Sequence, residues 1–441
     1  MTTTVKEIAA RARVASRALA RLSNNARNEV LLAVADGLEA AAAEIVSANA
    51  IDCAAAEKEV AAGKMSAAML KRLRVSNAGV REMALRVRDV TRLPDPLGRK
   101  LGATELDDGL LLVKESCALG VIGIVFESRP EVISQVASLT LKTSNAVIMK
   151  GGSESAHTNE VIVNVWRKAL EPFPAVPADA VQMLRTREEF AELLTMDRDV
   201  DMIVPRGSYE LVHYVMQNSR IPVLGHGEGV CHVYVDRAAD LEKALLVTFD
   251  SKVQYPAVCN AAETLLVDEA IAAKFLPPMM ARFSEAKVEV RGCPKTLAVL
   301  EASGGYIAAL KSATEQDWRT EYSDLIISVK IVVGLDEAIE HINRYGSKHT
   351  DAIITEDAGA AERFLNEVDS AGVYHNASTR FADGYRYGLG AEIGISNGKV
   401  HARGPVGLEG LTTYKWKLRG HGDVVADYAS GKKSFKHRVI Q

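Results

Sequence analysis

Hydrophobic positions recur at helical spacing along the first part of the chain, which is rich in alanine, leucine, arginine and glutamate. Val30, Val34 and Leu38, for example, fall on one face of a helix. Ser23 and Ser76 stand where a side-chain oxygen can cap a helix N-terminus. The pattern therefore predicts several consecutive helices that end near residue 93.

After a loop with two prolines and a glycine, the pattern changes to one typical of strands. Asp108-Gly109 separates two apolar segments of 104–115, as in a β-hairpin turn. Apolar and amphipathic segments then alternate. The expected strands are 120–126, 145–149, 181–184, 200–204 and 222–224, and the expected helices are 130–141, 153–170, 187–194 and 208–217. This alternation predicts a parallel, doubly wound sheet that binds ligands beyond the carboxyl ends of its strands, where Lys150 and Gly207 fall.

A second α/β pattern begins near residue 237. The expected helices are 240–249, 270–283, 336–345 and 358–368, and the expected strands are 263–267, 325–333 and 352–355. Residues 384–410 are glycine-rich and are expected to form a folded loop, whereas 411–418 alternates like an exposed edge strand. The fold class predicted is thus α/β, with a doubly wound first domain and a second α/β domain.

Composition narrows the functional classes. The chain has 441 residues, of which 48% are hydrophobic and 25% charged, and its formal net charge is -4. It carries no long basic run, so we expect no nucleic-acid binding. The most apolar run, 116–126, is shorter than the roughly 18 residues that a membrane-spanning helix needs. No metal-binding motif is visible, so we expect neither a membrane span nor a metal.

The five cysteines are scattered and contain no C-x-x-C pair, which favours free thiols in a reducing cytoplasm. Cys259 falls on a loop or a helix start between regular elements, where substrate can reach a thiol. A helix N-terminus would also lower the thiol pKa. A single cysteine is more often a buried apolar residue, so Cys259 alone does not establish catalysis.

Five motifs resemble, in order, those of the aldehyde dehydrogenase superfamily, and the resemblance covers essentially the whole chain. The motifs are 120–130 (GVIGIVFESRP), 147–153 (VIMKGGS), 204–208 (VPRGS), 253–260 (VQYPAVCN) and 401–407 (HARGPVG). The resemblance implies an aldehyde dehydrogenase-like fold with a β-hairpin oligomerisation arm. The implied division is 1–103 and 117–236 for the NADP-binding domain, 237–404 for the catalytic domain, 104–116 and 405–420 for the arm, and 421–441 for a C-terminal tail.

The closest resemblance is to the branch of this superfamily that works in L-proline biosynthesis. It implies NADPH-dependent reduction of L-glutamate 5-phosphate to L-glutamate 5-semialdehyde, with release of phosphate. It also implies a homo-oligomer, either a dimer or a tetramer. The chain has no kinase-like segment, so a separate glutamate 5-kinase must supply the unstable substrate and is a candidate transient partner.

The resemblance implies a set of cofactor-binding residues. Lys150 would hold the adenosine ribose or its 2′-phosphate, and Gly207 and Ser208 would approach the diphosphate at a helix start. Glu321 would bind the nicotinamide ribose. NAD-preferring relatives carry an acidic residue where Ser153 stands here. The absence of a carboxylate at this position favours NADPH over NADH.

The resemblance also implies the catalytic roles. Cys259 would be the nucleophile that forms a thioester. The donors that stabilise the oxyanion would be the Cys259 backbone N–H together with Ser128 or Asn260. Arg129 and Arg403 lie in motifs specific to this branch and are candidates for holding the leaving phosphate.

Two other interpretations of the function stay open. A hydrolytic or coenzyme A-acylating aldehyde dehydrogenase is one, but the glutamate that activates water in hydrolytic members falls near His226, where no acid stands. The other is a non-catalytic oligomeric protein that kept the fold. The presence of Cys259, Lys150 and Glu321 together argues against this second reading.

Overall fold

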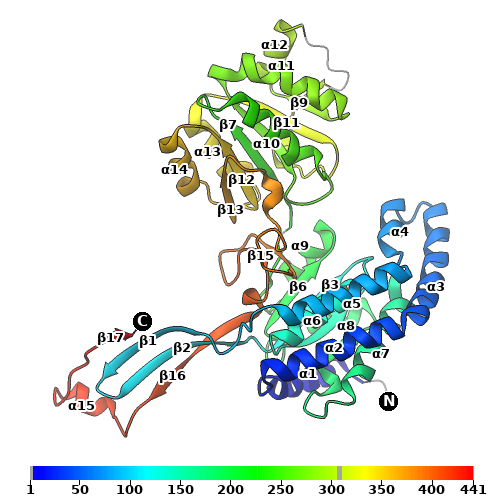
Figure 1. Ribbon diagram of the computed structural model, residues 1–441. Coiled ribbons are helices and arrows are strands. Elements are labelled where there is room, and N and C mark those ends of the chain that lie inside the picture. The colour runs from blue at the N-terminus through cyan, green and yellow to red at the C-terminus, as the bar shows by residue number, and fades with distance from the viewer. Residues whose placement is uncertain (1–2, 226, 305–309, 441) are drawn as a thin grey trace. The chain divides into compact units, whose positions relative to one another are not determined.

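The computed structural model describes residues 3–225, 227–304 and 310–440, and the chain forms two compact units. Unit 1 comprises Met1–Leu224, Leu389–Gly394 and Val406–Gln441. Unit 2 comprises Gly225–Gly388 and Ile395–Pro405. Unit 2 is therefore inserted, in sequence, within unit 1 (Figure 1).

The N-terminal helices of unit 1 form as predicted. They are α1 (Val5–Leu19), α2 (Asn24–Ala40), α3 (Ala42–Ala61), α4 (Ala67–Leu73) and α5 (Asn77–Arg92). The side chains of Ser23 and Ser76 cap α2 and α5, each accepting a backbone N–H three residues on. Val30, Val34 and Leu38 are buried where α2 packs against α5 and α7, so the helical period of the sequence marks the core face.

The sheet of unit 1 is parallel, as predicted, with the strand order β5-β4-β3-β6. Its strands are β3 (Val121–Phe126), β4 (Ala146–Lys150), β5 (Val181–Leu184) and β6 (Met202–Arg206). The helices that follow these strands are α6 (Val132–Lys142), α7 (Ala156–Leu170), α8 (Arg187–Leu193) and α9 (Tyr209–Asn218). Every residue of β3 and β4 is buried, which explains why both strands are apolar up to Lys150 at the end of β4.

Three local predictions in this sheet region are wrong. Helix α6 begins two residues after Pro130, because the chain first makes a turn. Ser153 does not cap a long helix; it begins a 3-10 turn (Ser153–Ser155) that precedes α7. The expected strand 222–224 is reduced to a single bridge between Ile203 and Val223.

An antiparallel sheet, which we call the arm, contains the predicted hairpin. Its order is β16-β2-β1-β17. Its strands are β1 (Lys100–Asp107), β2 (Leu110–Ala118), β16 (Thr412–Arg419) and β17 (Arg438–Ile440). Gly109 in the hairpin turn has a φ of 75°, a conformation that favours glycine. The segment expected as a tail instead contains helix α15 (Val425–Ala429) and β17, and ion pairs of Arg438 with Glu105 and of Lys436 with Asp107 accompany the pairing of β17 with β1.

Unit 2 contains the second α/β pattern as a parallel sheet with the order β10-β9-β11-β8-β7-β12-β13. The strands are β7 (Cys231–Val235), β8 (Ala262–Asp268), β9 (Glu289–Gly292), β10 (Leu310–Ser312), β11 (Ile326–Val332), β12 (Thr350–Ile354) and β13 (Gly372–His375). The helices are α10 (Leu241–Val253), α11 (Glu269–Glu285), α12 (Pro294–Ala302), α13 (Gly334–Tyr345) and α14 (Ala358–Glu367). The apolar core of this unit includes Phe275 and Phe283 of α11 against β8 and β11.

The boundary between the units differs from the expected one after residue 236. Strand β7 pairs with β8 and β12 of the second sheet, so it belongs to unit 2. The short strands β14 (Gly394–Ser396) and β15 (Gly404–Val406) pair with each other inside the glycine-rich segment. Across the described ranges, no helix is long and apolar enough to cross a membrane.

Candidate active site

Cys259 lies in a turn between α10 and β8, so the predicted loop placement holds and the helix-start alternative does not. Helix α10 ends at Val253, three residues before Pro256, which cannot supply the backbone N–H that a helix interior needs. The Cys259 side chain is partly exposed, whereas Cys231 and Cys293 are buried. A substrate can therefore reach this thiol.

His349 is a polar partner of this thiol. Its Nε2 lies 3.2 Å from Sγ of Cys259, and its Nδ1 lies 2.9 Å from the hydroxyl of Thr350. The imidazole is buried one residue before β12, and the contact with Thr350 fixes the ring. The sequence analysis missed His349, since nothing in its spacing to Cys259 signals that β12 and the turn meet.

The backbone of Gly229 contacts both Cys259 and Glu321. A Cβ at position 229 would collide with the carbonyl oxygen and Cα of Cys259, so only glycine allows this approach. The backbone N–H of Gly229 donates to Oε2 of Glu321 at 2.8 Å. The structure therefore brings Glu321 close to Cys259 through Gly229.

The backbone of Cys259 is also fixed by Cys231. The Cys231 thiol donates to the carbonyl oxygen of Cys259 at 3.2 Å. Burial raises the pKa of Cys231 well above its usual value, so this sulfur stays a protonated donor. Cys231 thus acts on the position of Cys259 and not as a nucleophile.

A buried ion pair joins the two ends of the loop that carries Cys259. Lys252, near the end of α10, lies 2.6 Å from Glu263 at the start of β8, and both side chains are fully buried. Burial raises the pKa of Glu263, an effect that the Lys252 ammonium opposes. The second oxygen of Glu263 accepts the backbone N–H of Ser323 at 3.3 Å, which ties in the segment next to Glu321.

Arg380 is a buried cation beside the same loop. Its Nε donates to Oε1 of Gln254 at 2.9 Å, and Arg386 donates to its carbonyl oxygen at 2.7 Å. Burial and the charge of Arg386 lower the pKa of Arg380, whereas the charges of Asp383, Asp250 and Cys259 oppose this change. The Arg380 guanidinium thus stands beside the loop that carries Cys259, and Arg386 contacts the Arg380 backbone; the sequence analysis named neither.

Arg403, a candidate for holding the leaving phosphate, contacts an acidic side chain in the structure. Its Nη2 contacts Asp369 at 3.1 Å, in a cluster where Lys348 and Lys399 also pair with Asp369. These cations lower the pKa of Asp369 to about 2, hydrogen bonding to Lys399 being the largest cause. In the structure, Arg403 is therefore engaged by Asp369.

Asn260 is buried next to Cys259. Its Nδ2 donates to the carbonyl oxygen of Ala382 at 2.8 Å, whereas its Oδ1 is buried and accepts no hydrogen bond from the described part of the chain. The contact links the loop that carries Cys259 to the segment that follows Arg380. Asn260 is thus positioned by the fold, with one amide hydrogen committed to Ala382.

In unit 1, Lys150 ends β4 as predicted, and its side chain is almost entirely buried. Burial lowers the pKa of Lys150, and the nearby Glu154 is the strongest of the charges that oppose this effect. A buried ammonium at the carboxyl end of a parallel strand is suited to an anionic ligand group. Lys150 therefore lies at the carboxyl end of β4, the position at which the sequence analysis expects it.

Ser128 and Glu154 are joined beside Lys150. The backbone N–H and the hydroxyl of Ser128 both donate to Oε1 of Glu154 at 2.7 Å. Ser128 has a φ of 45°, an unusual value for a residue other than glycine. The Glu154 carboxylate is thereby turned toward Ser128, and Ser153 presents only a hydroxyl at the neighbouring position.

Gly207 and Ser208 stand at the start of α9, as predicted. Ser208 caps the helix, and its backbone N–H donates to Oε2 of Glu127 at 2.8 Å. A Cβ at position 207 would lie 2.5 Å from the same carboxylate oxygen. The Glu127 carboxylate thus takes the place that a phosphate oxygen would take at a helix N-terminus.

These features fit a dinucleotide in unit 1. The helix start of α9 already holds one anion, and Lys150 offers a buried cation at the end of a neighbouring strand. Arg129 is exposed in the same unit. Within the residues that the structure describes, no cluster of histidine, cysteine or acidic side chains could hold a metal ion. His226, which the sequence analysis compared with a water-activating glutamate, lies outside the described residues.

Comparisons with known proteins point to one family over nearly the whole chain. The model of the aldehyde dehydrogenase family matches residues 1–296. The chain is 52% identical over 435 residues to gamma-glutamyl phosphate reductase of Haloquadratum walsbyi, which covers 98% of this chain and 95% of that protein. This similarity includes both units.

Solved structures share the fold. The crystal structure of gamma-glutamyl phosphate reductase from Thermotoga maritima has a TM-score of 0.91 at 39% identity, covering 96% of this chain and 100% of that one. Glyceraldehyde-3-phosphate dehydrogenase GapN from Methanocaldococcus jannaschii, solved with NADP, has a TM-score of 0.64 at 17% identity, covering 95% of this chain and 94% of that one. The second likeness is one of fold alone.

Proposed function

The chain belongs to the aldehyde dehydrogenase family, and we propose that it reduces L-glutamate 5-phosphate (gamma-glutamyl phosphate) to L-glutamate 5-semialdehyde in L-proline biosynthesis. The observation that carries this proposal is the 3.2 Å contact between Cys259 and His349 in an accessible turn. The relatives named for this activity are similar over nearly the full chain. The superfamily predicted from the sequence is thereby confirmed.

The reaction begins with removal of the proton from the Cys259 thiol by Nε2 of His349. The thiolate attacks the acyl carbon, a carbon–sulfur bond forms, and the bond to the phosphate oxygen breaks. Phosphate leaves with the electron pair, and a thioester remains on Cys259. After reduction, the carbon–sulfur bond breaks, the aldehyde leaves, and Cys259 is again a thiolate.

The negative oxygen formed at each stage needs nearby hydrogen-bond donors. The backbone N–H of Cys259 is the first proposed donor, because Cys231 and Gly229 fix the backbone at this position. The remaining amide hydrogen of Asn260 is the second. Ser128 remains a candidate, although its hydroxyl must first leave Glu154.

The proposed cofactor is NADPH, which supplies the hydride that reduces the thioester. Lys150 would hold the 2′-phosphate of the adenosine ribose, and Gly207 and Ser208 would hold the diphosphate, displacing Glu127 from the helix start. Glu321 would bind the nicotinamide ribose. The hydroxyl of Ser153, in place of a carboxylate, supports the choice of NADPH over NADH.

The proposed site for the substrate phosphate includes Arg380, whose guanidinium group donates to Gln254 in the loop that carries Cys259, and Arg386, which donates to the carbonyl oxygen of Arg380. Arg129, exposed in unit 1, stays a candidate from the sequence. Arg403 would have to leave Asp369 to take part. We therefore assign the leaving phosphate to Arg380 first.

We also propose that unit 1 is the NADP-binding domain, unit 2 the catalytic domain, and the arm an oligomerisation element. Exposed Tyr414, Trp416 and Leu418 on β16 support a homo-oligomer, either a dimer or a tetramer. A separate glutamate 5-kinase supplies the substrate and is a proposed transient partner. The cytoplasm, where both enzymes and NADPH would meet, is the proposed location.

The reverse reaction tests this function. L-glutamate 5-semialdehyde and NADP⁺ should acylate Cys259, and phosphate should then release the acyl group. Without phosphate we expect at most about one NADPH per active site, followed by a stall, because the thioester accumulates. Arsenate should restore turnover, since its acyl ester hydrolyses. The measurement is NADPH absorbance with and without phosphate.

Sustained turnover without phosphate would contradict the proposal. If glutamate accumulates under these conditions, the protein is a hydrolytic aldehyde dehydrogenase. If turnover depends on coenzyme A, it is an acylating dehydrogenase of another kind. If NADPH fluorescence shows binding but no turnover occurs with any acceptor, the non-catalytic reading is correct.

A further inference from the structure

Three neighbouring strands of unit 1 end beside one another at the proposed cofactor site. In the parallel sheet β4 pairs with β3, and β3 pairs with β6, in register up to their carboxyl ends. Lys150 is the last residue of β4, Glu127 directly follows β3, and Ser208 begins α9 two residues after β6. The main chain of Glu127 therefore lies between the strand that ends in the lysine and the strand that leads to the helix start.

The carboxylate of Glu127 occupies the start of α9. Its Oε2 accepts the backbone N–H of Ser208 at 2.8 Å. A Cβ on Gly207 would lie 2.5 Å from this oxygen, so the missing side chain leaves the room that the carboxylate fills. Ser208 caps the helix with its own hydroxyl, which accepts the backbone N–H of Leu211 at 3.4 Å. The N-terminus of α9 is therefore capped without Glu127.

Lys150 is a second and independent feature that suits an anion from outside the chain. Its residue is only 7% exposed. Across the described ranges of the chain, no ion pair or hydrogen bond engages its ammonium group. Burial lowers the pKa of Lys150, and the charges of Glu154 and Glu127 oppose this change. A buried ammonium without a paired carboxylate is costly to keep charged, and a phosphate group would stabilise it.

We propose that Glu127 is an internal competitor of the cofactor. Its carboxylate occupies the diphosphate position in the free protein, leaves when a dinucleotide binds, and returns when the oxidised cofactor departs. Two negative groups at one helix start repel each other, and the N–H of Ser208 has a single hydrogen to donate. The contact therefore weakens the binding of every dinucleotide and speeds its release after each turnover. This inference rests on the cofactor site of the proposed function.

Equilibrium binding to Glu127→Gln tests the inference without any turnover. Glutamine keeps the shape of the side chain and carries no charge, so it competes less well for the helix start. NADPH, NADH and ADP-ribose should each bind about tenfold more tightly than to the wild type, because a charge-assisted hydrogen bond no longer has to be broken. Adenosine 2′-monophosphate has no diphosphate, and its Kd should change far less. Calorimetric titration measures each Kd.

The release of NADP⁺ provides a kinetic test of the same contact. Affinity differences among variants of one site fall mostly on the dissociation rate. Glu127→Gln should therefore release NADP⁺ about tenfold more slowly, in line with its lower Kd. Stopped-flow displacement of bound NADP⁺ by an excess of NADPH measures this rate.

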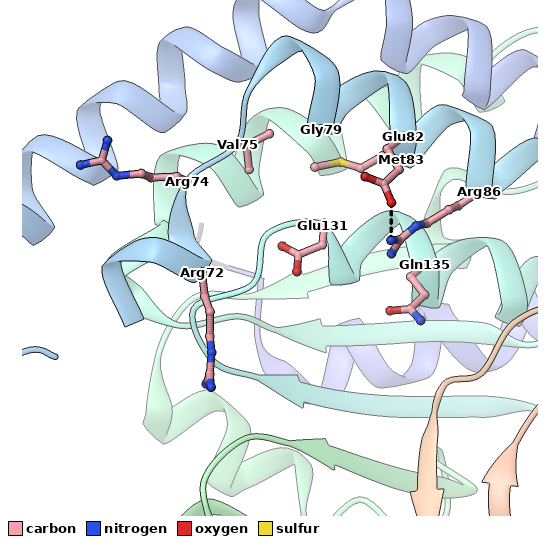
Figure 2. A pocket seen from close by; sticks show the side chains of 9 residues that line it. All are labelled: Arg72, Arg74, Val75, Gly79, Glu82, Met83, Arg86, Glu131 and Gln135. Atoms are coloured by element: carbon pink, nitrogen blue, oxygen red, sulfur yellow. Dashed lines mark hydrogen bonds and ion pairs between the residues drawn. The ribbon is translucent and has the colours of Figure 1, made fainter. Parts of the chain in front are cut away.

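Two other carboxylates of unit 1 provide matched controls. Glu210 is exposed in the first turn of α9, so Glu210→Gln removes an equal charge near the same helix start. Glu131 follows the same strand as Glu127 but faces a separate pocket, where its side chain points between Arg72 and Gln135 (Figure 2). Neither Glu210→Gln nor Glu131→Gln should tighten dinucleotide binding by a comparable factor.

The outcomes separate the inference from the proposed function. Equal Kd values of wild type and Glu127→Gln for the diphosphate ligands would overturn the inference alone. Weaker binding by Glu127→Gln would show that the carboxylate supports the site, and would also overturn it. Equal tightening for adenosine 2′-monophosphate or in Glu210→Gln would assign the effect to overall charge and overturn it as well. If the wild type bound no dinucleotide, the proposed cofactor site and the inference would fall together.

Discussion

Cys259 and His349 are the side chains on which the proposed chemistry depends most directly. A cysteine thiol reacts as its thiolate, so the rate of attack depends on where the thiol proton can go. His349 lies 3.2 Å from the sulfur and is oriented from behind by Thr350. The pair has the geometry of a nucleophile with its base, and each member can be removed separately.

We expect His349→Asn to lower kcat about a hundredfold to ten-thousandfold, because general base catalysis typically contributes this factor. The variant should also need a higher pH for alkylation of Cys259 by iodoacetamide, since the base that accepts the thiol proton is gone. Alkylation rates measured across pH report this directly. Cys259→Ala should abolish turnover altogether and keep cofactor binding.

His213→Asn serves as the control, because His213 lies exposed on α9 in unit 1. An unchanged alkylation profile in His349→Asn would mean that His349 is not the base. More than a few per cent of activity in Cys259→Ala would remove Cys259 as the nucleophile.

Lys150→Ala should weaken NADPH binding more than NADH binding. A 2′-phosphate needs a cation, and loss of a charge-assisted hydrogen bond costs about 1.5–3 kcal/mol, roughly tenfold or more in Kd. Fluorescence titration with each cofactor measures the two constants. Lys168→Ala, which removes an exposed lysine from α7 of the same unit, is the matched control. Equal weakening of NADPH binding and NADH binding would show that Lys150 does not contact the 2′-phosphate.

For single residues, the sequence predicted the structural position wherever the residue lies inside a contiguous motif. Cys259, Lys150 and Ser208 each follow or precede a recognisable element, so their places in a turn, at a strand end and at a helix start could be predicted. His349 and Arg380 could not, because parallel pairing of β12 with β7 and the turn at η4 (Thr379–Phe381) bring them to Cys259 from positions far away in sequence. Contacts of this kind depend on sheet order, which no local pattern encodes.

At the level of elements, the Lys252–Glu263 pair joins α10 to β8 beneath the turn that carries Cys259. Lys252→Met should lower the free energy of unfolding by roughly 3–5 kcal/mol, because it leaves a buried carboxylate without its cation. The double variant Lys252→Met/Glu263→Leu should recover most of this loss, since no unpaired charge remains. Denaturant unfolding measures both.

The exposed pair of Lys243 and Glu356 in the same unit provides a comparison, and Lys243→Met should change stability by at most about 1 kcal/mol. If Lys252→Met is as stable as the wild type, the pair of Lys252 and Glu263 does not stabilise the fold. If the double variant is less stable than either single variant, a hydrogen-bonding role of Glu263 with Ser323 outweighs the charge.

Elements with a strong internal pattern were predictable, and those that depend on a distant partner were not. Helix α2 and strand β3 follow from their own hydrophobic period or apolar run. Strand β17 has three exposed residues and becomes a strand only by pairing with β1, more than three hundred residues earlier. Strand β7 was placed in the wrong domain because its neighbours in the sheet, β8 and β12, come later in the chain.

For the whole molecule, the arm carries the clearest sign of assembly. Tyr414, Trp416 and Leu418 alternate along β16 and are each about half exposed, which places apolar side chains on one face of the sheet. Trp416→Lys should therefore shift the protein toward a smaller species, because a lysine at a buried interface would lose its hydration. Light scattering after size-exclusion chromatography measures the mass.

Leu246→Lys is the control, since Leu246 is a similarly exposed apolar residue on α10 of unit 2. The same mass for wild type and Trp416→Lys at low protein concentration would remove this face of the arm from the interface. A smaller mass for both variants would point to general destabilisation.

The interrupted sequence of unit 1 matters for how the protein is synthesised. Its first segment leaves the ribosome early, but residues 389–394 and 406–440 emerge only after all of 225–388 has been translated. Until then the β1–β2 hairpin has neither β16 on one edge nor β17 on the other, and unpaired strand edges promote aggregation. A ribosome that stalls in the last tenth of the message therefore releases a chain whose unit 2 is nearly complete and whose arm is not, a product that cellular quality control must recognise.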